Sequence, residues 1–292
     1  MTVSRGNNLK GYLFILPALL SIGVVFAYPL FQNLYFSLLD LAQAGRPFSG
    51  MRNYVLMAAD PLFWTSLRNN ALLILLVPVL VVVALVFAVV LFERVRGWRF
   101  YRGVMLIPYI TSITAVGLFF TLFFQGRGIL NTLLRSLGLE SLVVDWLGST
   151  RWALPAIMVV IVWREFGFGA MLFLARLATV PEELFEAARL DGAGWLRRLR
   201  NVVVPQLATV IEFYVFIMIV TMLSWVFNYI YVMTLGGPAR STFVTELYIY
   251  IMAFRMQKLG VASGVSIILL LITAALAFVS LRLRSRLSGE HE

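Results

Sequence analysis

Two neighbouring ionisable residues, Arg164 and Glu165, lie within an otherwise apolar stretch of the chain. A charged side chain at the centre of a membrane span costs on the order of 2.5 to 3.5 kcal/mol on insertion scales. Such residues therefore indicate a structural or functional role that offsets this cost. Adjacent positions on a helix point in different directions, and the spacing therefore argues against a simple ion pair. We expect Arg164 to contact a solute or a carboxylate of a partner subunit and Glu165 to bond a neighbouring helix. A purely structural role is the alternative.

Polar side chains also recur along a later apolar stretch. They are Thr221, Ser224, Asn228 and Tyr231. Their spacing of three, four and three residues places them on one face of a helix. Hydroxyl and amide groups can hydrogen-bond a sugar, and the ring of Trp225 lies close by in the sequence. The stripe predicts a solute path, with the alternative that these groups hold membrane helices together.

The chain lacks the residues of most catalytic and metal sites. No cysteine occurs, and the one histidine, His291, lies in a polar tail. Thiol chemistry, thiolate metal sites and histidine general bases are therefore excluded. Neither lysine, Lys10 nor Lys258, belongs to a phosphate-binding loop that ends in Gly-Lys-Ser/Thr. We expect no enzyme activity, and no cofactor or metal bound by this chain.

The composition places these residues in a membrane. Of the 292 residues, 61% are hydrophobic and 13% are charged, and the mean hydropathy is +0.91, outside the range of soluble domains. Stretches of about 20 apolar residues match a hydrocarbon core about 30 Å thick. Six of them predict an all-α integral membrane protein, with spans at residues 12–37, 71–92, 104–124, 152–175, 207–235 and 261–281.

The net charge of +10 has a simple explanation in a membrane protein. Basic residues favour the cytoplasmic loops, and both the arginine cluster at 94–102 and the basic tail at 282–286 fall on the same side as the N-terminus. The sequence therefore predicts a single membrane domain over residues 1–292, with both termini in the cytoplasm. No nucleic-acid partner is needed to explain the charge.

The loop between the fourth and fifth spans, residues 179–205, has its own helical pattern. Thr179 is expected to cap a helix of residues 180–190, with Pro181 in its first turn. Asp191-Gly192 then allows the left-handed conformation that reverses the chain into a second, arginine-rich helical piece. The loop thus predicts a compact helix-turn-helix on the cytoplasmic side.

One side of this helix-turn-helix is apolar. Leu184 and Phe185 are apolar and Ala187 is small, so this side fits a groove on a partner protein. An amphipathic helix resting on lipid headgroups is the alternative. That alternative explains the amphipathic pattern but leaves the spacing of the motif unexplained.

The same loop resembles the signature of permease subunits in binding-protein-dependent ABC importers. The matching residues are Glu186, Ala187, Ala188, Asp191, Gly192 and Pro205. The resemblance implies that these residues form a coupling loop, about residues 179–205, that meets a separate ATPase. It also implies a fold like that of the type I importer permeases.

The likeness to the carbohydrate-uptake class of these permeases extends over most of the chain. It includes residues 12–18, 50–54 and 227–238, and it places the chain near the sugar and glycerol-phosphate importers. Asn228 departs from the pattern, since an acidic residue is common there, and this leaves the charge of the solute open. Arg164 is the only deep positive charge, which favours a neutral sugar or polyol.

The resemblance implies a set of partners. They are a second permease subunit, usually unlike the first, two cytoplasmic ATPases that bind ATP and Mg²⁺, an external solute-binding protein and the lipid bilayer. The location implied is the plasma or inner membrane of a bacterium or archaeon. The alternative is a self-sufficient secondary transporter, which is expected to show repeated halves with broken helices at matching positions. No such repeat is visible in the sequence.

Overall fold

A computed structural model describes residues 5–41, 43 and 45–288, and these residues are mainly helical. Their only β pairing is an isolated bridge between Leu39 and Phe48. The α-helices are α1 Arg5–Ile22, α2 Tyr28–Ser37, α3 Arg52–Ala59, α4 Pro61–Ile74, α5 Leu76–Phe92, α6 Trp98–Ile110, α7 Ile113–Phe123, α8 Ile129–Ser136, α9 Ala153–Leu177, α10 Glu182–Leu190, α11 Trp195–Arg198, α12 Val204–Ser224, α13 Phe227–Met233, α14 Thr245–Tyr250 and α15 Leu259–Ser288. The predicted all-α class is confirmed. His291 lies outside the described residues.

Within the described ranges, five helices are long and apolar enough to cross a membrane, or six if one bent pair counts as a single span. The five are Leu13–Ser37, Pro61–Phe92, Ala153–Leu177, Trp195–Ser224 and Leu259–Val279, and the bent pair is α6 with α7. The prediction of six spans therefore holds when the third is a broken one. The chain is a multi-pass membrane protein.

The chain forms two compact units. One unit extends to Asp60 and adds Ile249–Leu270, and the other contains Pro61–Tyr248 and Leu271 onward. In the first unit, the buried side chain of Asn53 donates to the carbonyl oxygens of Ser37 and Leu39, both at 2.8 Å. All the residues predicted to couple or to contact solute lie in the second unit.

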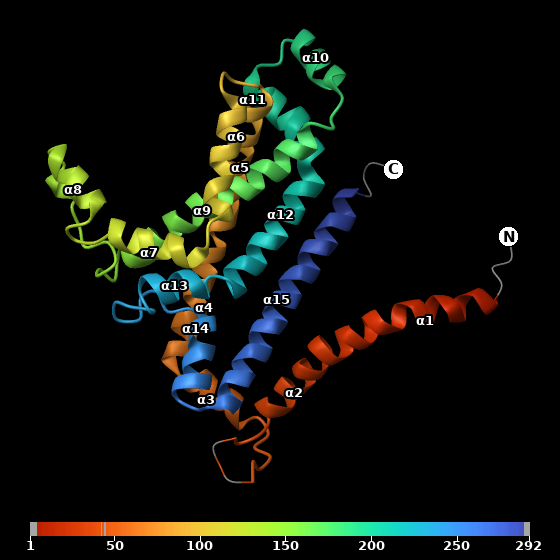
Figure 1. Cartoon of the computed structure of the whole chain (residues 1–292), viewed down its shortest axis with the longest axis vertical. Helices are drawn as coiled ribbons and strands as arrows, with labels where there is room; N and C mark the ends of the chain where they lie inside the picture. The colour runs from red at the N-terminus through yellow and green to blue at the C-terminus, as the bar shows by residue number, and fades with distance from the viewer. Residues whose placement is uncertain (1–4, 42, 44, 289–292) are drawn as a thin grey trace. The chain divides into compact units, whose positions relative to one another are not determined.

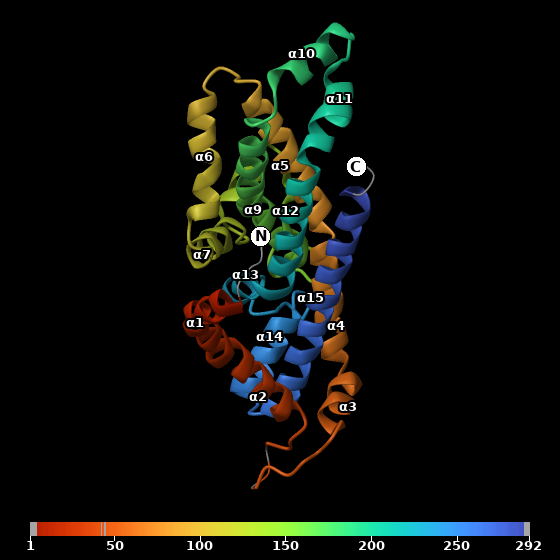
Figure 2. The same cartoon turned by 90° about the vertical axis from the view of Figure 1, so that its right-hand side faces the viewer.

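Helices α5, α9 and α12 form the core of the second unit (Figures 1 and 2). They approach closely because α9 carries glycine where its neighbours cross it. A Cβ added at Gly169 would lie 2.5 Å from the ring of Tyr214 on α12 and 2.8 Å from Ala84 on α5. Small residues bring membrane helices together in this way and increase their van der Waals contact.

The third span breaks between α6 and α7, which meet at 95°. Pro108 lies in the last turn of α6 and removes a backbone donor there. Thr111 then adopts an extended conformation, so the helix ends there and α7 begins at Ile113. The break leaves carbonyl groups of α6 without helical partners.

The fifth span also differs from the prediction. Helix continues from Trp195 to Ser224, so the second piece of the loop and the span are one rod. A π-helical turn, Leu199–Val203, precedes Pro205 and accommodates this residue inside the helix. The predicted end of the span at Leu235 is wrong, because α12 ends at Ser224 and the chain changes direction into α13 (Figure 1).

Candidate functional site

The predicted helix-turn-helix is present as α10 and α11 at one end of the second unit (Figures 1 and 2). We call residues 182–198 the elbow. Gly192 has a φ of +71° and its amide donates to Arg189 O, which makes it the left-handed residue that ends α10. The expected turn at Asp191-Gly192 is therefore confirmed.

The start of α10 differs from the expectation. The hydroxyl of Thr179 donates to the carbonyl oxygen of Arg176 and accepts from its guanidinium, both at 2.8 Å. It makes no capping bond, and Pro181 occupies the N-cap position just before the helix. Thr179 therefore stabilises the end of α9, and the acidic pair Glu182 and Glu183 complements the helix dipole at the start of α10.

Two contacts attach the elbow to the last residues of α5. The ring of Phe185, only 7% exposed, packs on Phe92 with 5.1 Å between ring centroids. Arg198 Nη2 lies 3.7 Å from Glu93 Oε1, and both side chains are partly exposed. Removing a buried phenylalanine ring costs about 3–5 kcal/mol, whereas an exposed ion pair contributes about 0–1 kcal/mol. The aromatic contact is therefore the stronger of the two.

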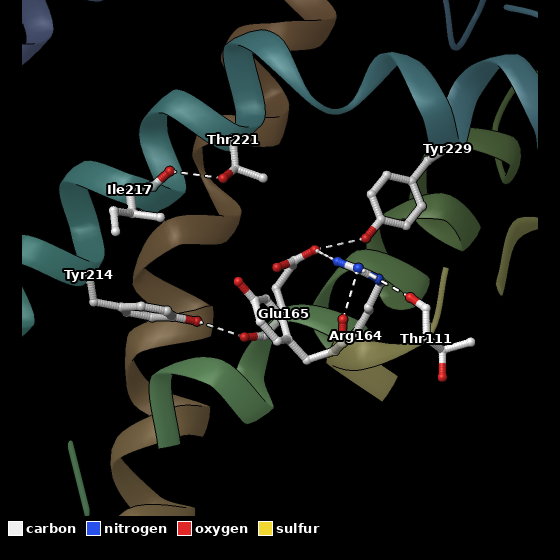
Figure 3. Close-up of polar contacts among 8 residues, drawn as sticks. Thr111, Arg164, Glu165, Tyr214, Ile217, Thr221 and Tyr229 are labelled. Carbon is white, nitrogen blue, oxygen red and sulfur yellow. Dashed lines mark hydrogen bonds and ion pairs between the residues drawn. The ribbon is translucent and has the colours of Figure 1, made fainter. Parts of the chain in front are cut away.

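Arg164 and Glu165 lie at the centre of a buried network (Figure 3). The guanidinium of Arg164 donates to Glu165 and to the carbonyl oxygens of Tyr109 and Thr111, at 2.9 and 3.2 Å. These carbonyls are the ones that the break between α6 and α7 leaves free. The expectation that the two neighbours would not pair is wrong, because the long arginine side chain bends back to reach the carboxylate.

Glu165 connects this network to the fifth span. Its carboxylate accepts a 2.8 Å hydrogen bond from the hydroxyl of Tyr229 on α13, and its backbone carbonyl accepts one of 3.2 Å from Tyr214 on α12 (Figure 3). The expected bond from Glu165 to a neighbouring helix is therefore confirmed. Two adjacent residues of α9 thus contact both halves of the fifth span and the bend of the third.

The polar stripe spans the break between α12 and α13. Thr221 and Ser224 lie on α12, Trp225 follows it, and Asn228 and Tyr231 lie on α13. The predicted single helical face is therefore interrupted, and its parts meet where the chain bends (Figure 1). Broken membrane helices frequently contribute to solute sites, so the break is compatible with the predicted role.

The polar side chains of the stripe also differ from one another in whether they make hydrogen bonds. The hydroxyl of Thr221 donates to Ile217 O at 2.9 Å (Figure 3). By contrast, the side chains of Ser224 and Asn228 make no hydrogen bond within the described part of the chain. Trp225 is 58% exposed. Three neighbouring groups at the break therefore remain available for an outside partner.

Sequence reasoning missed a second polar cluster, which clamps residues 234–246 onto α4. The amide of Asn69 donates to Ser241 O and Phe243 O at 3.0 and 2.9 Å. The amide of Asn70 donates to Met222 O at 2.9 Å and to Glu246 at 3.1 Å. We call residues 234–246 the clamped segment. The adjacent asparagines were a visible signal, but their partners lie more than 150 positions away.

Glu246 is the least satisfied member of this cluster. It lies between the fifth and last spans, and its Oε1 atom is buried with no hydrogen-bond partner among the described residues. Loss of solvent raises the pKa of this carboxyl to about 7, although the bond from Asn70 opposes the shift. The side chain is therefore partly protonated near neutral pH.

Among the described residues, no three His, Cys, Asp or Glu side chains gather as a metal site. The Arg164 network joins an ion pair to tyrosine hydroxyls and backbone carbonyls, and its groups are bonded to one another except for the buried Nε atom of Arg164, which has no partner among the described residues. This arrangement suits holding helices in place. The unbonded groups at the helix break suit contact with a polar solute.

Comparison with known proteins decides the family. The family model described as "Binding-protein-dependent transport system inner membrane component" matches residues 61–288, well over half of the chain. The chain belongs to this family. As such an inner membrane component, it is the permease part of a transport system, and the alternative of a self-sufficient secondary transporter is not favoured.

Relatives of this permease match it over nearly their whole length. The probable ABC transporter permease protein YurN of Bacillus subtilis (strain 168) is 35% identical and covers 94% of this chain and 96% of its own. The lactose transport system permease protein LacF of Rhizobium radiobacter is 31% identical and covers 95% of each. These values confirm the resemblance that the sequence predicted.

A solved structure shows the same fold. The crystal structure of a bacterial alginate ABC transporter in complex with an alginate pentasaccharide-bound periplasmic protein contains a chain with a TM-score of 0.81 to this permease. The two are 20% identical, over 94% of this chain and 93% of that one. At this identity the likeness concerns the fold, and it confirms the type I permease architecture.

Within the permease, all the predicted site residues except Pro205 lie in three places. The elbow holds Glu186, Ala187, Ala188, Asp191 and Gly192. Pro205 lies outside it, inside the continuous helix. The other two places are the helix break, with the polar stripe, and the network around Arg164.

Proposed function

We propose that this permease forms half of the solute path of an ATP-driven importer for a carbohydrate or related polyol. A second permease subunit, two ATPase subunits that bind ATP and Mg²⁺, and an external binding protein complete the assembly. The chain itself catalyses no reaction. The name of LacF, a lactose system permease 31% identical over 95% of this chain, supports the substrate class.

The observation that carries this function is the set of exposed apolar residues on the elbow. Leu184, Leu190 and Leu196 project from a loop that is otherwise rich in charge, and Leu190 is 89% exposed. Exposed apolar residues gathered on a short helical segment mark a protein contact surface. We assign this surface to the ATPase, with Glu186 to Ala188 and the Gly192 turn in the contact, and we infer that the elbow lies in the cytoplasm.

The orientation of the chain follows from this assignment. If the elbow is cytoplasmic, both termini are cytoplasmic too, in agreement with the distribution of arginines. Labelling of single cysteines introduced at exposed positions tests it, since the chain has no cysteine of its own. We expect Leu190→Cys to be labelled only from the cytoplasm and Glu140→Cys only from outside.

For the solute path, we propose the unbonded groups at the break between α12 and α13. Ser224 and Asn228 supply a hydroxyl and an amide, and Trp225 supplies an aromatic face, a combination that suits a neutral sugar. Thr221 and Tyr231 border this site. We assign Arg164 a positioning role, because its terminal nitrogens already bond Glu165 and the end of α6.

Purification of the tagged chain from its native host tests the function. The chain is expected to co-purify with an ATPase and a second permease. In proteoliposomes with the binding protein outside, uptake of a labelled sugar is expected to require internal ATP and to stop when the catalytic carboxylate of the ATPase is replaced. Uptake by this chain alone, driven by an ion gradient, would contradict the proposal.

A further inference from the structure

Both arms of the elbow meet the same end of α5. On the first arm, Phe185 of α10 packs on Phe92, the last residue of α5. Val89, Leu199 and Val203 line a cavity of about 30 Å³ on one side of the two rings, and a wider cavity of about 450 Å³ lies beside them on another. The direct contact between the two rings can pass a displacement from the elbow to α5, because close-packed groups transmit strain.

The second arm reaches the neighbouring residue. Arg198, at the end of α11, pairs with Glu93, which directly follows Phe92. The helix then continues through the π-helical turn into α12 without interruption. The elbow is thus joined covalently to α12 and non-covalently to α5.

The link between the elbow and α9 is weaker. Residues 178–181 separate α9 from α10 and contain no helix. The hydrogen bonds of Thr179 return to Arg176 on α9 and do not reach α10. The position of α10 therefore depends on its contacts to α5 and to the π-helical turn at Leu199–Val203 more than on this short connection.

We propose that Phe185 and the Glu93–Arg198 pair are positioning residues that fasten the elbow to α5. A displacement of the elbow then moves α5 first. Because α9 packs along α5, the displacement passes to α9 and from there to the break between α12 and α13. The inference rests on the proposed function, since it presumes an ATPase that moves the elbow. It adds which residues pass that movement on, and to which helix.

The close packing of α9 completes the route. Phe87 of α5 packs on Phe166 of α9, with 5.1 Å between ring centroids. One residue before Phe166, Glu165 bonds Tyr229 on α13. A displacement of α5 therefore reaches the helix break through side chains that are already in contact.

The test uses the complete importer in proteoliposomes and measures solute transported per ATP hydrolysed. Phe185→Ala is expected to lower this ratio by about two- to thirtyfold, the range found for residues that modulate coupling. ATPase binding and ATP hydrolysis should persist. Phe185→Leu, which retains most of the apolar volume, should restore much of the ratio, because the role requires packing and not aromatic chemistry.

The ion pair offers a matched control. Arg198→Ala is expected to lower the ratio by a smaller factor than Phe185→Ala. Arg197→Ala removes an exposed neighbour that has no partner among the described residues, and it should leave the ratio unchanged. Exchange of both charges, Glu93→Arg with Arg198→Glu, should recover the loss seen in either single variant. An equal ratio in Arg197→Ala and Arg198→Ala would remove the pair from the proposal.

A cross-link keeps the inference testable if Phe185→Ala fails to assemble. The variant Phe92→Cys with Phe185→Cys is oxidised to tie the elbow to α5 and reduced again as its own control. Transport by the oxidised complex supports the fastening. Arrest on oxidation with recovery on reduction would overturn it, because the two residues would then have to separate. ATP-dependent uptake by the wild type in the same vesicles shows separately whether the proposed function holds.

Discussion

The elbow and the clamped segment are both loops of the second unit, but they are held in opposite ways. The clamped segment is pinned by Asn69 and Asn70 through buried hydrogen bonds to its backbone and side chains. The elbow projects its polar side chains into solvent and is attached through Phe185 and one exposed ion pair. Directional buried bonds fix the clamped segment in one geometry, whereas the elbow can move together with the end of α5 to which it is fastened.

The difference indicates which loop moves during transport. Unsatisfied buried polar groups are expensive, so the clamped segment cannot shift without a large cost. The polar side chains of the elbow stay in solvent when it moves, so its movement leaves no buried polar group without a partner. We therefore expect the clamped segment to act as a fixed support for the helix break and the elbow to act as the moving input.

The largest effect is expected from breaking the clamp. Asn70→Leu removes both donor bonds of the amide and the acceptor for Thr245 N–H. Each orphaned buried group costs about 1–3 kcal/mol, so the variant should fail to accumulate as folded protein. Size-exclusion profiles of detergent extracts measure this. Thr65→Ala, whose hydroxyl bonds only a carbonyl of its own helix, is the control. Wild-type levels of folded Asn70→Leu would contradict the fixed role of the clamp.

A substitution at Gly192, in the turn of the elbow, tests whether the elbow is the moving loop. Gly192→Val forces a β-branched residue into a left-handed conformation that costs about 1–2 kcal/mol, although space around the residue is open. We expect transport per ATP to fall roughly tenfold while the spans remain inserted. Gly194→Ala, at a φ of −63° and also in open space, should behave as wild type. Full coupling in Gly192→Val would argue against the elbow as input.

A third test concerns Asn228, which lies between the two loops in the sequence. Asn228 lies at the break and, unlike that of Asn70, its side chain makes no hydrogen bond within the described residues. Asn228→Leu should raise the apparent KM for the sugar by about two- to tenfold, as expected for one lost hydrogen bond of about 0.5–1.5 kcal/mol. The yield of assembled importer should stay constant. A loss of assembly before any loss of transport would show that Asn228 holds helices together.

The smallest effect concerns Glu246 in the clamped segment. Burial raises its pKa from 4.5 to about 7, so the folded state holds more protons than the unfolded state between these values. Stability should therefore fall as pH rises through this window. Glu246→Gln should flatten the dependence and raise the Tm at pH 8 by about 2–4 °C. Exposed Glu140→Gln serves as control, and an unchanged pH profile in Glu246→Gln would refute the assignment.

Local signals in the sequence predicted much of the fold. The apolar stretches indicated the spans, and Asp191-Gly192 indicated the turn of the elbow because few other residues adopt a positive φ. The family motif located the elbow residues, since its spacing is contained within one short loop. These features depend on residues close together in the chain.

Features that depend on distant residues were missed. No glycine or proline marks the break at Trp225 and Val226, and the bend before Ile113 depends partly on Arg164, which bonds the freed carbonyls. The pairing of Arg164 with Glu165 also required knowledge of how the long side chain bends. Asn70 and Glu246 are 176 positions apart, a separation that helical periodicity cannot bridge.

The π-helical turn at Leu199–Val203 sets the angle at which the elbow meets the rest of the unit. Such a turn holds one residue more than an α-helical turn, and each residue of an α-helix corresponds to about 100° of rotation. Deleting a single residue here would restore a regular helix and swing the guanidinium of Arg198 by that angle, away from Glu93. The orientation of the whole elbow thus depends on the number of residues in one short turn.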